Sequence, residues 1–109
     1  MNWTELTDMA QLAAIAEESK TQPVVIFKHS IRCSISSMAK TRLEREAQPQ
    51  GIKFYYLDLI NHRDISNKVA EMFSVHHESP QVLLIKNGEC VYEESHNGID
   101  MAEIAEQAA

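Results

Sequence analysis

The sequence contains few of the residues that build linkers, disulfide frameworks or membrane spans. Only three glycines, three prolines and two cysteines occur among its 109 residues. This scarcity argues against a long flexible linker, and two cysteines cannot form a multi-disulfide scaffold. The longest apolar runs, such as the one at 24–27, are far shorter than the ~20 residues that cross a membrane. We therefore expect a single domain over residues 1–109 and no membrane partner.

Basic residues are scarce as well. Ten Lys and Arg stand against sixteen Asp and Glu, which gives a net charge of −6 and a pI near 5.3. Because no stripe of Lys and Arg is present to displace counterions, nucleic acid is not expected as a partner. The first ten residues lack the basic and long apolar segments of a secretory signal. These features predict a cytoplasmic protein whose two thiols are normally reduced.

Helical and strand periodicities alternate along the chain. The expected elements are a helix at 5–19 capped by Thr4 or Thr7, a strand at 24–28, a helix from 35 that ends before 49, a strand at 53–60, a helix around 65–73, strands at 81–86 and 89–94, and a helix after 100. In the second helix, Met38, Ala39 and Leu43 are expected to share one face. The Asn87-Gly88 dipeptide predicts a hairpin. The order predicts an α/β fold with a mixed four-stranded sheet, helices on both faces and a helix before the first strand.

Cys33 is the first candidate for chemistry, because it lies where the first predicted strand ends and a helix begins. The free N–H groups and the dipole of that helix favour a thiolate there. Arg32 is adjacent in sequence, and Lys28 or His29 could also be close. A thiolate is the form that attacks disulfides. The alternative is an inert buried thiol, since free cysteine is among the most buried residue types.

The motif continues as Cys33-Ser34-Ile35-Ser36, with serine where a dithiol oxidoreductase has its resolving cysteine. A serine can donate a hydrogen bond to the thiolate but cannot close a disulfide. The sequence therefore predicts monothiol chemistry, in which Cys33 is released by an outside thiol. Cys90 lies in an apolar strand without a cationic neighbour and is expected to be structural.

Ser79-Pro80 leads directly into an apolar strand and is a candidate cis peptide beside the thiol, although a trans proline opening a strand is the alternative. His76 and His77 precede it and could approach Cys33, or could be ordinary surface histidines. His29 is interpreted as a packing residue at a strand end. No Cys or His spacing of the zinc-site kind is present, so no metal is expected.

Four segments carry a resemblance to a known family: FKHSIRCSIS at 27–36, FYYLDLI at 54–60, HESPQVLLIKNGE at 77–89 and SHNGI at 95–99. With them the chain resembles the bacillithiol-system redox-active proteins, a monothiol bacilliredoxin-like family of thioredoxin-like fold. The family's motif more often has proline where this chain has Ser34. By ungapped count, the buried carboxylate of thioredoxins falls on the apolar Phe27, which fits a site without a resolving thiol.

The resemblance implies that the protein removes bacillithiol, a cysteine–glucosamine–malate thiol, from oxidised proteins. Cys33 would be the nucleophile and Pro80 the cis-proline. Bacillithiol would be a co-substrate, with no tightly bound cofactor. Bacillithiolated proteins, a small thiol and another redoxin would be partners.

Five further residues are expected to bind substrate or stabilise the thiolate: Arg32, Ser34, Ser36, His77 and Ser79. Among them, Arg32 suits the malate carboxylates of bacillithiol. Two other functions stay open, an iron–sulfur carrier of the monothiol-glutaredoxin type and a non-catalytic interaction module of thioredoxin-like fold.

Overall fold

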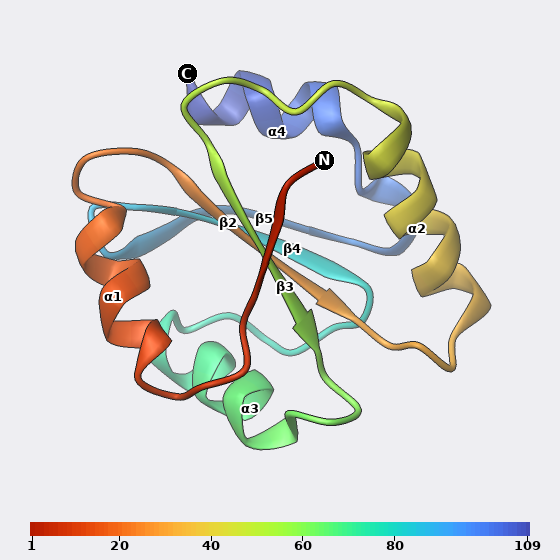
Figure 1. Ribbon diagram of the computed structural model, residues 1–109, viewed down its shortest axis with the longest axis horizontal. Helices are drawn as coiled ribbons and strands as arrows, with labels where there is room; N and C mark the ends of the chain where they lie inside the picture. Colours follow the sequence, from red (N-terminus) through yellow and green to blue (C-terminus); the bar gives the residue numbers. More distant parts are fainter.

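The fold is a central five-stranded sheet with helices on both faces, seen in a computed structural model that describes residues 1–109 (Figure 1). The strands are β1 (Trp3–Glu5), β2 (Val24–His29), β3 (Lys53–Asp58), β4 (Gln81–Lys86) and β5 (Glu89–Ser95), in the spatial order β1-β3-β2-β4-β5. The helices are α1 (Gln11–Glu18), α2 (Ser34–Arg45), α3 (Arg63–Met72) and α4 (Met101–Ala108), with a 3₁₀ turn, η1, at His96–Gly98.

The two strands β2 and β4 form the centre of the sheet and are almost completely buried. β2 pairs in parallel with β3 and antiparallel with β4, so the sheet is mixed as expected. β4 and β5 form the predicted hairpin, in which Asn87 and Gly88 have φ angles of 54° and 77°. Two successive positive φ angles are what a tight two-residue hairpin turn requires, and Asn-Gly tolerates them best.

Two separate apolar clusters fill the two faces of the sheet. The first contains side chains from α1 and α3, including Leu12, Ile15 and Val69, against alternate residues of β2 and β4. The second contains Leu43 of α2 and Ile104 of α4 against the other set of alternate residues. Because successive strand residues face opposite sides, β2 contributes to both clusters. The prediction of helices on both faces and the thioredoxin-like fold class is confirmed.

The predicted strand count is wrong by one, because the chain begins with β1. Trp3, Thr4 and Glu5 pair in parallel with residues 54–56 of β3. A three-residue edge strand has too little pattern to be recognised locally, and it forms only because β3 offers a free edge. The first helix consequently starts at Gln11 rather than at residue 5. The Gln11 side chain accepts the N–H groups of Thr7 and Asp8, at 2.8 and 2.9 Å, and neither threonine acts as a cap.

Trp3 anchors β1 to the sheet, and its removal should destabilise the protein. Its ring stacks on Phe27 at 5.5 Å between centroids and meets Phe54 and Tyr56 edge-on at 6.0 Å. We expect Trp3→Ala to lower the free energy of unfolding by about 2 kcal/mol, measured by urea denaturation, since a half-buried aromatic contact is lost. Glu44→Gln keeps an acceptor for the Trp3 indole N–H and should change stability by less than ~0.5 kcal/mol. Equal effects of the two variants would contradict this role for the ring.

Candidate functional site

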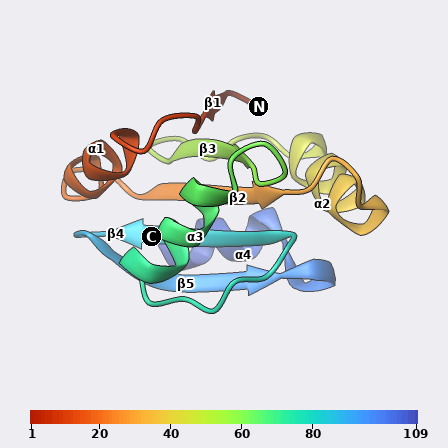
Figure 2. The same cartoon turned by 90° about the horizontal axis from the view of Figure 1, so that it is seen from below.

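Cys33 lies at the junction predicted from the sequence, as the N-cap residue of α2. The chain leaves β2 at His29 and passes through a short turn into α2 (Figure 2). In that turn the Cys33 N–H donates to the Ser30 carbonyl at 3.1 Å. The thiol is partly exposed and unoxidised. The N–H groups of the first three helical residues, Ser34 to Ser36, have no hydrogen-bond partner and no side-chain cap. Such unpaired groups make a helix N-terminus a favourable place for an anion.

Ser36 does not hydrogen-bond to Cys33, so that part of the prediction is wrong. Its Oγ is fully buried, accepts the Ser30 N–H at 3.0 Å and lies 2.7 Å from His29 Nδ1. Burial, with a smaller effect from the Lys40 charge, lowers the pKa of His29 and so favours the neutral ring. A neutral ring that accepts at Nδ1 leaves the Ser36 hydroxyl as the donor. Ser36 is therefore held by β2 and the turn after it.

His29 is more than the packing residue expected. It does pack, with its ring 5.7 Å from that of Phe27 and 4% exposed. Its Nδ1 atom nevertheless faces the last position of the Cys33–Ser36 motif. The ungapped count against thioredoxins pointed to Phe27 as the counterpart of a buried base. Side chains alternate along a strand, so residues 27 and 29 both face α2. This alternation could have pointed to His29 as the polar residue that faces α2.

The Ser79-Pro80 peptide bond is cis, as anticipated, and lies at the same end of the sheet. Lys28 pairs with Gln81 across the antiparallel β2–β4 ladder, so Pro80, which precedes Gln81, lies at the end of the sheet where β2 ends. Figure 2 shows β4 beginning at that end, on the side where the chain passes from β2 into α2. The Pro80 carbonyl accepts the His96 N–H at 3.0 Å, a contact from η1 that sequence reasoning missed. The main-chain N–H and C=O of Ser79 have no hydrogen-bond partner, and its Oγ is buried without one. They are available to an added strand.

Lys28 and His77 form a contact on the other face of β2. Lys28 is 0% exposed, and its Nζ donates to the Ser66 carbonyl at 3.2 Å and lies 3.2 Å from His77 Nδ1. Burial lowers the pKa of Lys28 to about 8. Burial and then the Lys28 charge lower the pKa of His77. The sequence left open whether Lys28 or His29 lies close to Cys33; the structure directs Lys28 toward α3 and the loop before Pro80. His76 is a surface histidine with a side chain 90% exposed.

Arg32 and Ser34 flank Cys33 at the surface. Both are exposed, and neither side chain makes a hydrogen bond or ion pair within the chain. Three apolar side chains near them are also open to solvent, namely Ile31, Ile35 and Met38, 53%, 45% and 62% exposed. Met38 was expected on the buried face of α2, but Ser36, Ala39 and Leu43 fill that face. Cys33 is thus bordered by one free cation and apolar surface.

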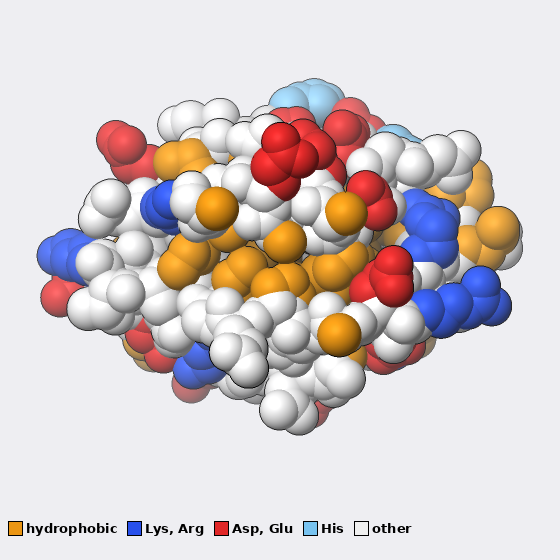
Figure 3. Space-filling view, turned by 90° about the horizontal axis from the view of Figure 1, so that it is seen from above, with side chains coloured by type: hydrophobic (Ala, Val, Ile, Leu, Met, Phe, Trp, Pro, Cys, Tyr) orange, Lys and Arg blue, Asp and Glu red, His pale blue; other side chains and the backbone are white.

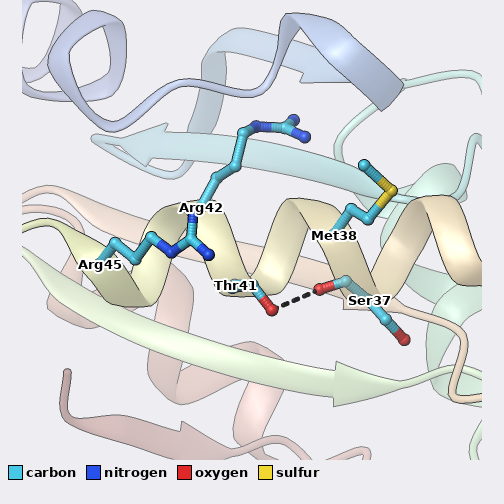
Figure 4. Close-up of a pocket in the computed structure, with 5 residues that line it drawn as sticks. All are labelled: Ser37, Met38, Thr41, Arg42 and Arg45. Atoms are coloured by element: carbon cyan, nitrogen blue, oxygen red, sulfur yellow. Dashed lines mark hydrogen bonds between the residues drawn. The ribbon is translucent and has the colours of Figure 1, made fainter.

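A shallow hollow of about 390 Å³ continues along α2 away from Cys33. It is lined by Ser37, Met38, Thr41, Arg42 and Arg45 (Figure 4). Arg42 donates to the carbonyls of His96 and Ile99 and so ties α2 to η1. The space-filling view shows Lys and Arg side chains beside apolar ones on the α2 side of the molecule (Figure 3). Cations are therefore locally concentrated on a protein whose overall charge is negative.

Cys90 lies at the opposite end of the sheet. It pairs with Ile85, which pairs with Val24 at the start of β2. β2 alone extends ~17 Å toward Cys33, far beyond the ~7 Å limit between Cα atoms of a disulfide. The Cys90 thiol packs against the first apolar cluster and donates to the Tyr92 carbonyl at 3.3 Å, and burial raises its pKa. This agrees with the structural role expected for it.

Neither a metal-binding cluster nor a membrane-spanning helix is present in the structure. No group of three or more His, Cys, Asp or Glu side chains is arranged to hold a metal ion. None of the helices has the length and apolar character needed to span a membrane.

Together, a cysteine at the β2–α2 junction and a cis-proline opening β4 define a protein of thioredoxin fold. Solved structures agree: thioredoxins from Fasciola hepatica and Malassezia sympodialis match with a TM-score of 0.77 each, at 20% and 17% identity. These two matches cover 96% and 99% of this chain, and 98% and 92% of theirs. At 30% identity and a TM-score of 0.84, this chain is also similar to a protein described as a proposed oxidoreductase with a thioredoxin fold, covering 96% of this chain and 92% of that one.

The family follows from the sequence match. A family model described as monothiol bacilliredoxin BrxC matches residues 4–104. The chain therefore belongs to the monothiol bacilliredoxin family, as the resemblance indicated, and its function is a redox one.

The buried Lys28 should make stability depend on pH. Its pKa is about 8 in the folded protein, below the ordinary value of 10.5, so the unfolded chain holds more protons between these values and stability rises with pH. The penalty is fully present below pH 8 and disappears above pH 10.5. We expect Lys28→Met to raise the free energy of unfolding by about 3 kcal/mol at pH 7. That gain should shrink by about 2 kcal/mol at about pH 10.

Denaturation of both proteins at the two pH values measures this difference. Lys68→Met, at an exposed position of α3, should show no comparable pH dependence relative to the wild type. Parallel stability–pH curves for the wild type and Lys28→Met would contradict a depressed Lys28 pKa.

Proposed function

We propose that the protein is a monothiol thiol–disulfide oxidoreductase that removes bacillithiol from proteins. The Cys33 thiolate attacks the bacillithiol sulfur of a mixed disulfide. The S–S bond between the bacillithiol sulfur and the substrate protein's sulfur breaks, the substrate protein leaves as a thiolate, and a Cys33–bacillithiol disulfide forms. An external thiolate then attacks the bacillithiol sulfur of that disulfide. Cys33 is released as a thiolate and a new disulfide carries bacillithiol away, so electrons balance in both steps.

One observation carries the monothiol assignment: Cys33 has no second thiol within reach. Position 36 is a serine whose hydroxyl is engaged with His29, and Cys90 lies at the far end of the sheet. A Cys33 adduct cannot resolve inside the chain and persists until an outside thiol arrives. A small thiol or another redoxin would supply that step. Such a relay needs a reduced thiol pool, which supports a cytoplasmic location.

The surroundings of Cys33 suit a mixed disulfide with a protein on one side and an anionic small thiol on the other. The free main-chain groups of Ser79 can pair with an extended segment of the substrate protein. Exposed Ile31, Ile35 and Met38 offer apolar contact to the same partner. Arg32 has no partner of its own and can approach the malate carboxylates of bacillithiol.

The first test identifies the reacting cysteine. After exposure to oxidised bacillithiol, intact-protein mass spectrometry should show one adduct on the wild type and on Cys90→Ser, and none on Cys33→Ser. Cys33→Ser should also lose reduction of a bacillithiolated model protein, whereas Cys90→Ser should retain at least about half of it, because its thiol is packed and remote. Full activity in Cys33→Ser would falsify the proposal. No adduct on the wild type would favour a non-catalytic module.

The second test introduces a resolving thiol at position 36. In Ser36→Cys the new thiol replaces a hydroxyl 2.7 Å from His29 Nδ1, a base able to take its proton. We expect the oxidised variant to close a disulfide between Cys33 and the introduced thiol, and to release bacillithiol without an external thiol. A two-dalton mass loss and the free bacillithiol measure these outcomes. Ser34→Cys, one residue from Cys33 and exposed, is the matched control and should keep the adduct. An adduct equally stable in Ser36→Cys would contradict the geometry.

A further inference from the structure

Lys28 is a buried cation without a counter-ion. It lies within the apolar strand β2, is 0% exposed and forms no ion pair. Its Nζ contacts two atoms from two different segments, the Ser66 carbonyl oxygen of α3 and His77 Nδ1 of the loop before β4, both at 3.2 Å. A buried charge without a carboxylate is unfavourable for stability. Fold stability therefore does not account for this lysine.

The contact determines which nitrogen of His77 carries a proton. An ammonium group has only donors, and the Ser66 carbonyl can only accept. His77 Nδ1 must then accept as well, so the proton of the neutral ring is on Nε2. Nδ1 faces the buried Nζ, the residue as a whole is exposed, and Nε2 has no hydrogen-bond partner in the chain. Lys28 thus leaves His77 with a free N–H donor at Nε2.

The loop that carries His77 is also held in place on both sides of it. Gln81 is 1% exposed, and its Nε2 donates to the His76 carbonyl at 3.0 Å. Its Oε1 accepts the Glu78 N–H at 3.4 Å. Gln81 pairs with Lys28 across the sheet and directly follows Pro80. The same two neighbouring strand positions therefore hold the loop, the His77 ring and the start of the cis-proline turn.

The other charges around His77 do not reverse this arrangement. Burial and Lys28 lower its pKa most, His76 and Arg63 lower it further, and only Glu78 raises it. The Glu78 carboxylate lies 3.7 Å from His76 and 3.9 Å from His96. No carboxylate of the chain is hydrogen-bonded to His77. An uncharged donor without an acceptor of its own is left in the loop that leads to the cis-proline, three residues before Pro80.

We propose that Lys28 is a positioning residue that fixes His77 as a donor to a carboxylate of the small thiol bound at Cys33. This inference rests on the proposed function and adds to it the recognition of an anionic thiol moiety. Arg32, adjacent to Cys33, would supply charge to that moiety, and His77, in the loop that leads to the cis-proline, would supply a directional hydrogen bond. Lys28 would not touch the substrate.

The tautomer of His77 can be measured without any activity. Two-bond ¹H–¹⁵N NMR spectra of the wild type at about pH 7 should show a neutral His77 ring protonated at Nε2. In Lys28→Met, which we expect to fold, the spectrum should change to a mixture of both tautomers. Lys28→Arg, which keeps donors at this position, should restore the Nε2-protonated form. A wild-type ring protonated at Nδ1, or at both nitrogens, would overturn the proposal.

Kinetics with two substrates separates recognition from a general loss of reactivity. The probes are one model protein carrying bacillithiol and the same protein carrying uncharged 2-mercaptoethanol. We expect His77→Leu and Lys28→Met to lower kcat/KM about 10-fold for the first, mainly through KM, since one hydrogen bond to a charged group is lost. The change for the second probe should be less than about twofold. His76→Gln, a neighbouring exposed position, should leave both values unchanged.

Equal losses for both probes would mean that Lys28 and His77 act on structure or on the thiol, and would refute the recognition role. Failure of the wild type to react with either probe would instead refute the proposed function. In that case a His77 protonated at Nε2 would still support the positioning by Lys28, because the NMR measurement needs no substrate.

Discussion

The site depends on one constraint, the burial of β2 on both faces at the point where it ends. β3 and β4 pair with this strand on its two sides, and helices cover it above and below. Its last two residues are nevertheless polar, and alternation sends Lys28 to one face and His29 to the other. Buried polar groups need partners. Lys28 finds Ser66 and His77, and His29 finds Ser36. These partners determine how the loop before Pro80 and the first turn of α2 are held.

Much of the fold could be predicted because several of its elements have clear local sequence patterns. β2 and β4 contain uninterrupted apolar runs at 24–27 and 82–85, and the Asn87-Gly88 dipeptide favours a tight hairpin turn. β1 could not be predicted, since three residues carry no periodicity and their pairing with β3 is a tertiary event. The exposure of Met38 was missed for a similar reason. Neighbouring residues such as Met38 and Ala39 lie ~100° apart on a helix, so only packing decides which of them is buried.

The positions of Cys33 and of the cis peptide at Pro80 agree with the sequence-based expectation, but the hydrogen bonds around them were not predicted. Cys33 and Pro80 were recognised from their places between elements, which local pattern reports well. The partners of Ser36, Lys28 and His77 were not recognised, because each lies on a segment distant in sequence from the group it contacts. A polar residue inside an apolar strand is the one signal that was available. At Lys28 and His29 this signal marked two buried polar contacts at the end of β2, the strand that leads to Cys33.

Buried polar atoms without hydrogen-bond partners provide independent evidence for the same end of the sheet, the end where β2 stops and β4 begins. Only two buried side-chain oxygens lack a hydrogen-bond partner, Ser66 Oγ and Ser79 Oγ. Ser66 is the residue whose carbonyl holds Lys28, and Ser79 precedes the cis-proline. Native proteins keep such atoms rarely, and each one needs an explanation. The main chain of Ser79 is also unpaired, and under the proposed function these free groups are the ones that an extended segment of a substrate protein would use. The other buried side-chain nitrogen and oxygen atoms have partners, so the unpaired ones are confined to residues that flank the Lys28 contact and the cis-proline.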